Sequence, residues 1–158
     1  MTYTQKYCIV SFLSNIAEGV EFDMKSWPLH VTQVGVFAID DVTDIYNRLE
    51  QIAYKTNCID TQIQGDAMFG DTKVNLVENT KDLYMLHKAI VGLLVDGGAV
   101  IQSPDHQLEG FKPHCTVQDK ERVVTGQKIT LQSISIIDMF PDANWQKRKT
   151  IKNYFFGS

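Results

Sequence analysis

Two short stretches, Pro28-Leu29-His30-Val31-Thr32 and Pro113-His114-Cys115-Thr116-Val117, each place a threonine two residues after a histidine. Each pair lies in an apolar run with β-branched residues, which predicts a β-strand. Each run also follows a proline, which is tolerated at the start of a strand but not within a central one. Because the two copies are separated by about half of the chain, they indicate an internal duplication.

Side chains alternate between the two faces of a strand, so His30 and Thr32 point the same way, as do His114 and Thr116. If the two strands lie side by side, two imidazoles and two hydroxyls converge on one groove. Histidine titrates near neutral pH, so this pair suits the general base and general acid of phosphodiester hydrolysis. The hydroxyls would hold the non-bridging oxygens of the phosphate. Neither a metal nor another cofactor is needed, and which histidine is the base stays open.

These motifs, His30-Val31-Thr32 and His114-Cys115-Thr116, resemble the paired H-x-T/S motifs of the 2H phosphoesterase superfamily. That superfamily includes the RNA 2',5'-ligase-like proteins, the 2',3'-cyclic phosphodiesterases and several 2',5'-phosphodiesterases. The length of the chain and the spacing of the motifs are also similar to that family. The resemblance implies a two-lobed arrangement, in which each lobe supplies one motif to a central cleft.

The rest of the sequence predicts an α+β domain with antiparallel sheets and helices packed outside. Strands are expected at 7–13, 29–37, 59–69, 72–77, 114–118, 126–139 and 150–156, and helices from Asp40 or Asp41 to about Thr56 and from Thr80 to Gly97-Gly98. Residues 14–26 are expected to form a polar loop. The long segment 97–113, strand-like only at 99–102, is typical of a binding loop or lid. We therefore expect one domain over 1–158, with pseudo-symmetric lobes of approximately 1–78 and 79–158.

The composition restricts the expected partner. The chain has a net charge of −4, and its basic residues cluster only at 147–149 and 152. Proteins that grip long nucleic acid usually present a basic face, because neutralisation of phosphates drives their binding. We therefore expect a small nucleotide or a short or cyclic oligonucleotide, and no long duplex. The apolar run 89–95 is too short to span a bilayer, so no membrane contact is expected.

The cysteines indicate the compartment. The chain has an odd number of cysteines at scattered positions, Cys8, Cys58 and Cys115. This pattern argues against a disulfide framework and favours a reducing environment. Residues 1–6 lack the apolar core of a signal peptide, so a cytoplasmic protein is expected. The cysteines and histidines show no spacing typical of a metal site.

Several residues near the motifs are candidates for contact with the substrate; they are Phe12, Trp27, His106, Phe111 and Lys112. The three aromatic rings could stack on a base, although packing in the core or at the rim is their more common role. His106, beside Asp105, and Lys112 are otherwise explained as solvated side chains.

Two further residues invite other interpretations. His87 lies at helix spacing from Leu83 and is expected at a helix edge. Cys115 is adjacent to His114, which suggests a Cys–His nucleophile, but neighbouring residues of a strand point to opposite faces.

With the resemblance, these observations predict a metal-independent phosphoric diester hydrolase. Its bond would be a 2',3'-cyclic phosphate, or a 2',5' or 3',5' linkage of an oligonucleotide or cyclic oligonucleotide. His30 and His114 would be catalytic, and Thr32 and Thr116 would bind the phosphate. The alternatives are RNA end ligation or trimming, and a catalytically silent nucleotide-binding protein, which the complete set of four motif residues disfavours.

Overall fold

The computed structural model describes residues 5–118 and 121–158. The expectation for residues 1–6 thus falls mostly outside the described residues. The chain forms two antiparallel sheets and two α-helices, which confirms the predicted α+β class. Among the described residues no helix is both long enough and apolar enough to cross a membrane.

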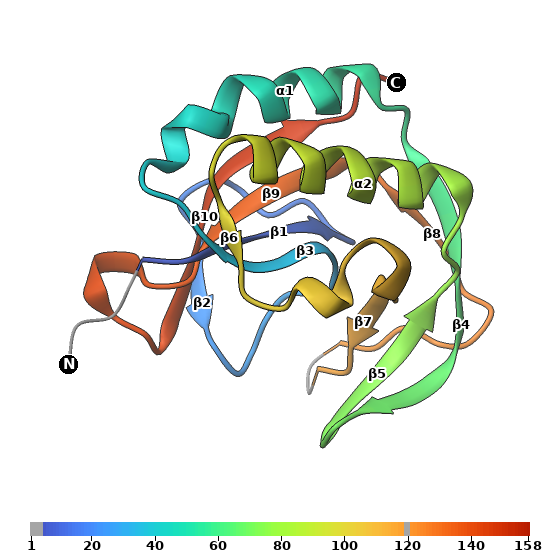
Figure 1. Ribbon diagram of the computed structural model, residues 1–158. Helices are drawn as coiled ribbons and strands as arrows, with labels where there is room; N and C mark the ends of the chain where they lie inside the picture. The colour runs from blue at the N-terminus through green and yellow to red at the C-terminus, as the bar shows by residue number, and fades with distance from the viewer. Residues whose placement is uncertain (1–4, 119–120) are drawn as a thin grey trace.

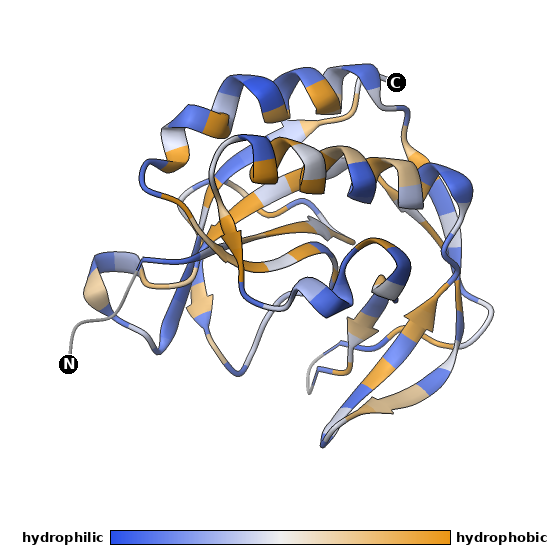
Figure 2. Cartoon of the chain, viewed as in Figure 1, coloured by the Kyte–Doolittle hydropathy of each residue, from blue (hydrophilic) through white to orange (hydrophobic). Residues whose placement is uncertain are grey.

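The larger sheet has six strands in the order β2-β10-β9-β1-β3-β6. Its strands are β1 (Tyr7–Phe12), β2 (Glu21–Asp23), β3 (His30–Ala38), β6 (Val100–Ile101), β9 (Ser133–Asp138) and β10 (Lys147–Phe155). Helices α1 (Tyr46–Lys55) and α2 (Lys81–Asp96) lie side by side over one face of this sheet (Figure 1). Strands β3 and β9 are mainly hydrophobic, whereas the outer surface of α1 is mainly hydrophilic (Figure 2). The main core therefore lies between this sheet and the helices.

The smaller sheet has four strands in the order β7-β5-β4-β8. Its strands are β4 (Ile59–Phe69), β5 (Thr72–Val77), β7 (His114–Thr116) and β8 (Lys128–Leu131). The first half of β4 alternates buried and exposed residues, as expected for a strand with one face in the core and one face exposed to solvent. The expected strands 59–69 and 72–77 are confirmed, and the turn between them lies at Gly70, whose φ of 62° favours glycine. Strands β3 and β7, from different sheets, lie next to each other where the two sheets meet.

The two sheets do not follow the expected division of the chain near residue 78. Each sheet takes strands from both sides of that point, because β9 and β10 return to pair with β1 and β2, and β8 returns to pair with β4. The two motifs therefore enter the cleft from different sheets, but each sheet is built from both parts of the chain.

The predicted starts of both helices are confirmed. The carboxylate of Asp41 accepts a hydrogen bond from the Thr43 amide at 3.0 Å, and a 3₁₀ turn over Val42–Ile45 leads into α1. The hydroxyl of Thr80 accepts from the Leu83 amide at 3.2 Å at the start of α2.

Several details differ from the sequence-based expectations. The polar loop at 14–26 contains the short strand β2, and β10 begins three residues earlier than expected because it pairs with β2. The expected strand at 126–139 is two strands separated at Gln132. The segment 97–113 contains β6, within the stretch 99–102 that was expected to be strand-like, and also two unexpected 3₁₀ turns, Pro104–His106 and Leu108–Gly110. Elements this short carry too few residues to show a period in the sequence.

Candidate active site

The two motif histidines are held in the same way. His30 begins β3 and His114 begins β7. In each, the ring Nδ1 lies 2.8 Å from the carbonyl oxygen two residues earlier, that of Pro28 or Lys112. A carbonyl oxygen only accepts, so Nδ1 carries the proton and donates it to this bond. The Nε2 atom of each neutral ring is therefore left as a proton acceptor for a substrate.

An aromatic ring packs beside each of these histidines. The ring centroids of Trp27 and His30 are 4.7 Å apart, and those of Phe69 and His114 are 4.5 Å apart. Phe12 contacts the His30 ring edge-on from 6.2 Å. Phe69, at the end of β4, was not among the sequence candidates, because its only signal was its place at the end of the expected strand 59–69. These rings restrict the imidazoles and shield them from water.

This shielding lowers the pKa of both histidines. Burial lowers the pKa of His30 to about 4, against the raising effect of its bond to the Pro28 carbonyl, and the nearby His114 lowers it further. Burial likewise lowers the pKa of His114, with a smaller contribution from His106. The imidazoles of His30 and His114 are therefore mainly neutral at pH 7 in the absence of substrate. The rings of His30, His106 and His114 lie close enough to interact electrostatically.

Two adjoining hollows surround the motif residues. The larger, of about 670 Å³, is lined by His114 and Thr32. The smaller, of about 350 Å³, is lined by His30, Thr32 and Thr116. They share Thr32 and two further residues of β3, Gly35 and Val36. The structure thus brings the four motif residues together around one junction. We call these residues, His30, Thr32, His114 and Thr116, the quartet.

The remaining candidates separate into two groups. His106, Phe111 and Lys112 line the larger hollow, and Trp27 lines the smaller one. Phe12 lines neither hollow, because it is buried in a cluster behind His30. Four of the five candidates therefore lie where a substrate bound at the quartet would reach them.

The expectation for His87 is wrong. It is fully buried instead of lying at a helix edge, since α2 packs on β3 and the segment before β7 covers the ring. Cys115 is also fully buried in the core, and burial raises the pKa of its thiol to about 12. The Cys–His nucleophile is therefore not supported. All three cysteines are free, and within residues 5–118 and 121–158 no three His, Cys, Asp or Glu side chains are grouped to hold a metal ion.

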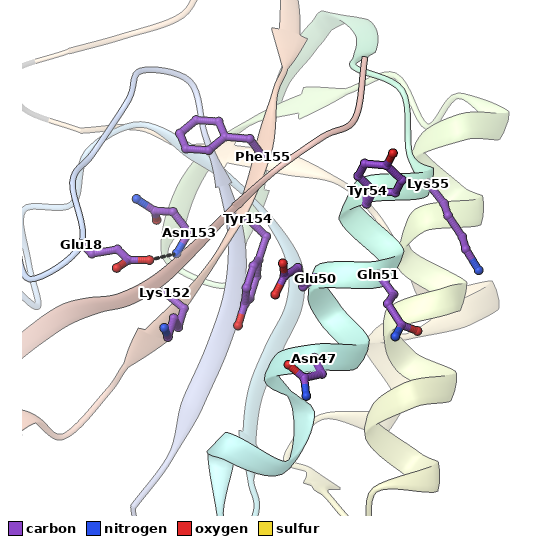
Figure 3. A pocket seen from close by; sticks show the side chains of 10 residues that line it. All are labelled: Glu18, Asn47, Glu50, Gln51, Tyr54, Lys55, Lys152, Asn153, Tyr154 and Phe155. Carbon is purple, nitrogen blue, oxygen red and sulfur yellow. Dashed lines mark hydrogen bonds between the residues drawn. The ribbon is translucent and has the colours of Figure 1, made fainter.

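A further hollow of about 670 Å³ lies between α1 and β10 (Figure 3). Its walls carry Glu50 and Tyr54 from the helix and Lys152 to Phe155 from the strand, and Glu18 accepts a hydrogen bond from the Asn153 amide. None of the four motif residues lines it. Although it equals the larger motif hollow in volume, no histidine lines it, so we place the candidate site at the motifs.

The sequence and the fold are both similar to those of known proteins. A family model described as the 2'-5' RNA ligase superfamily matches residues 21–146, which include both motifs. No curated protein matches the sequence.

Solved structures with the same fold cover nearly the whole chain. A structure described as a phosphoesterase has a TM-score of 0.61 at 12% identity, over 99% of this chain and 100% of that one. Escherichia coli LigT complexed with 3'-AMP has a TM-score of 0.62 at 12% identity, with the same coverage. The protein TT0787 of Thermus thermophilus has a TM-score of 0.62 at 11% identity, over 97% and 98% of the two chains. Other LigT structures contain NADP+ or ATP.

Proposed function

Because this chain belongs to the 2'-5' RNA ligase superfamily of 2H phosphoesterases, we propose that it is a metal-independent phosphodiesterase acting on a small nucleotide. The observation that carries this proposal is the matched pair of histidines. Each is tied through Nδ1 to a backbone carbonyl and retains Nε2 for proton transfer. A catalytically silent binder has no need of two such anchors.

The reaction follows from this geometry. Nε2 of one histidine takes a proton from water as the water oxygen forms a bond to phosphorus. Nε2 of the other histidine, protonated, gives its proton to the leaving oxygen as the P–O bond breaks. The Thr32 and Thr116 hydroxyls donate to the non-bridging oxygens, whose charge changes in the transition state. One phosphodiester becomes a phosphomonoester and an alcohol. At the end of the reaction the histidine that was neutral is protonated, and the histidine that was protonated is neutral.

The hollows support a compact substrate. Volumes of about 670 and 350 Å³ are in the range of small-molecule sites. The 3'-AMP, NADP+ and ATP bound by LigT, which has the same fold, are nucleotides of this size. The bond opened is a 2',3'-cyclic phosphate, or a 2',5' or 3',5' linkage of a short or cyclic oligonucleotide. The net charge of −4 gives little long-range attraction for an extended polyanion.

Substrate size provides the test of this proposal. We expect kcat/KM for mono- to trinucleotide-sized substrates, linear or cyclic, to exceed that for a long single strand at equal linkage concentration and physiological salt. The measurement is product formation followed by chromatography over a panel of such substrates. Preference for the long strand, with binding that weakens steeply as salt rises, would reveal a polyanion-binding groove and contradict the proposal.

Chelation is expected to leave the activity unchanged. Two histidines suffice for both proton transfers, and within the described residues the acidic, histidine and cysteine side chains form no group of three that could bind a metal. Turnover after exhaustive treatment with EDTA should therefore equal that of untreated protein. Loss of activity that one divalent ion restores would refute the metal-independent mechanism.

Filling the junction of the hollows at Gly35 should obstruct the substrate. A side chain at this position is compatible with the strand, because φ is not positive and the nearest atom to an added Cβ is Gln107 Nε2 at 4.0 Å. We expect Gly35→Leu to lower kcat/KM by roughly tenfold or more, mainly through KM. Gly65→Leu is the matched control, since Gly65 is a strand glycine outside both hollows with open space at its Cβ. Equal kinetics for the two variants would place the substrate elsewhere.

A further inference from the structure

His87 connects the two parts of the chain that form the site. Its Nδ1 lies 2.6 Å from the carbonyl oxygen of Gln33, the residue after Thr32 on β3. Its Nε2 accepts a hydrogen bond of 2.9 Å from the backbone N–H of Leu108. Because Nδ1 faces a carbonyl and Nε2 faces an N–H, the ring must be neutral, with its proton on Nδ1. Burial also lowers the pKa of His87, which favours this form.

The segment that His87 holds forms a wall of the larger hollow. The Phe111 ring stacks on the His87 ring with centroids 3.8 Å apart and planes within 3°. Phe111 and Lys112 line the hollow, and the Lys112 carbonyl orients His114. His87 therefore connects a strand that carries one motif with the segment that leads into the other.

This segment does not hold its shape by local geometry alone. Leu108 has a φ of 54°, a left-handed conformation that costs energy for a residue other than glycine. At Gly110 an added Cβ would lie 1.9 Å from the Asp105 carbonyl oxygen, so the chain turns tightly back on itself. A conformation of this kind persists when surrounding contacts fix it. The bond from the Leu108 amide to His87 is such a contact.

We infer that His87 is a positioning residue for a nucleoside subsite in the larger hollow. This inference rests on the proposed function, in which the quartet binds the phosphate. The nucleoside on the His114 side of the phosphorus lies in the larger hollow, between Phe69 of β4 and the segment held by His87. His87 itself touches no reacting atom. It fixes the wall against which the nucleoside packs, while the hydroxyls of Thr32 and Thr116, to which His87 makes no hydrogen bond, hold the phosphate.

The test compares two probes, adenosine 3'-monophosphate and inorganic phosphate, titrated by calorimetry at pH 7 into the full chain. His87→Phe retains a ring to stack on Phe111 but removes both hydrogen bonds. We expect its Kd for the nucleotide to rise roughly tenfold or more, because both hydrogen bonds that position the wall are lost, and its Kd for phosphate to change less than twofold. His87→Gln, whose amide supplies both a donor and an acceptor, should recover most of the nucleotide affinity.

Leu94→Ala is the matched control, because Leu94 is fully buried in the same helix two turns beyond His87. It should reduce the stability of the fold without separating the two affinities. If His87→Phe does not fold, His87→Asn replaces it with the same expectations, since its shorter amide reaches only one of the two partners.

Each other outcome overturns the inference. Wild-type nucleotide affinity in His87→Phe would show that the segment is positioned without His87. An equal loss of both affinities would show that His87 supports the whole site instead of a nucleoside subsite. Wild-type protein that binds neither probe would refute the proposed function, and the inference with it.

Discussion

Alanine in place of His30 or His114 is expected to lower kcat by roughly 10²–10⁴-fold, the usual cost of removing a general acid or base. Each variant removes one of the two Nε2 atoms that the backbone anchors leave for the substrate. Thr32→Ala and Thr116→Ala should cost less, because each removes one hydrogen-bond donor to the phosphate. The measurement is kcat on any substrate that the wild-type protein turns over.

Asparagine is the matched control for the loss of the ring. In His30→Asn and His114→Asn the amide nitrogen takes the place of Nδ1 and can donate to the same carbonyl, whereas no group replaces Nε2. These variants should fold like wild type and be as inactive as the alanine variants. If both His30→Ala and His114→Ala retain near wild-type turnover, the two-histidine mechanism is wrong.

The second prediction with a large expected effect concerns the pH dependence of kcat/KM. Turnover needs one neutral and one protonated histidine, a form that is most abundant between the pKa values of the pair. Burial lowers the pKa of His30 to about 4 and lowers that of His114 from its ordinary value of 6.5. The optimum of kcat/KM should therefore lie below pH 6.5. Above it the protonated histidine becomes scarcer, so kcat/KM should fall about tenfold per pH unit, or roughly 100-fold over two units.

The same experiment checks the direction of two further shifts of the pH profiles. Bound phosphate is anionic and favours the imidazolium form, so the optimum of kcat should lie at higher pH than that of kcat/KM. His106 lowers the pKa of His114, so His106→Ala should move the alkaline limb of kcat/KM to higher pH. The profiles are measured from pH 4 to 9 at constant ionic strength. A flat kcat/KM profile, or a maximum above pH 7.5, would contradict this assignment.

Local patterns in the sequence were enough to predict the strands that carry the motifs. Alternation placed His30 and Thr32 on the cleft face of β3 and Val31 in the core, where it is fully buried. The cap residues Asp41 and Thr80 likewise act through amides two or three residues away. Interactions of this range depend on neighbouring residues, which is why the sequence alone shows them.

Contacts between distant segments could not be predicted in the same way. Phe69, at the end of β4, reaches His114 because β5, which follows it after the turn at Gly70, pairs with β7, and nothing near Phe69 in the sequence indicates this pairing. His87 faces Gln33 and Leu108, on two other elements, so its helical spacing alone indicated only an edge position. The mixing of strands from both parts of the chain in each sheet has the same origin, since strand pairing is a long-range property.

The central claim is that the quartet hydrolyses a phosphodiester, and hydrolysis in ¹⁸O-labelled water tests it most directly. The panel of mono- to trinucleotide-sized substrates is incubated with wild-type protein and EDTA. The products are then separated, and their masses are measured by mass spectrometry. We predict one ¹⁸O atom in the phosphomonoester for each bond opened by the wild type, and no product from the His30→Ala/His114→Ala double variant. Product without ¹⁸O would indicate transfer to a hydroxyl, as in ligation or cyclisation. Labelled product formed equally fast by the double variant, or no product from any member of the panel with wild type, would contradict the account.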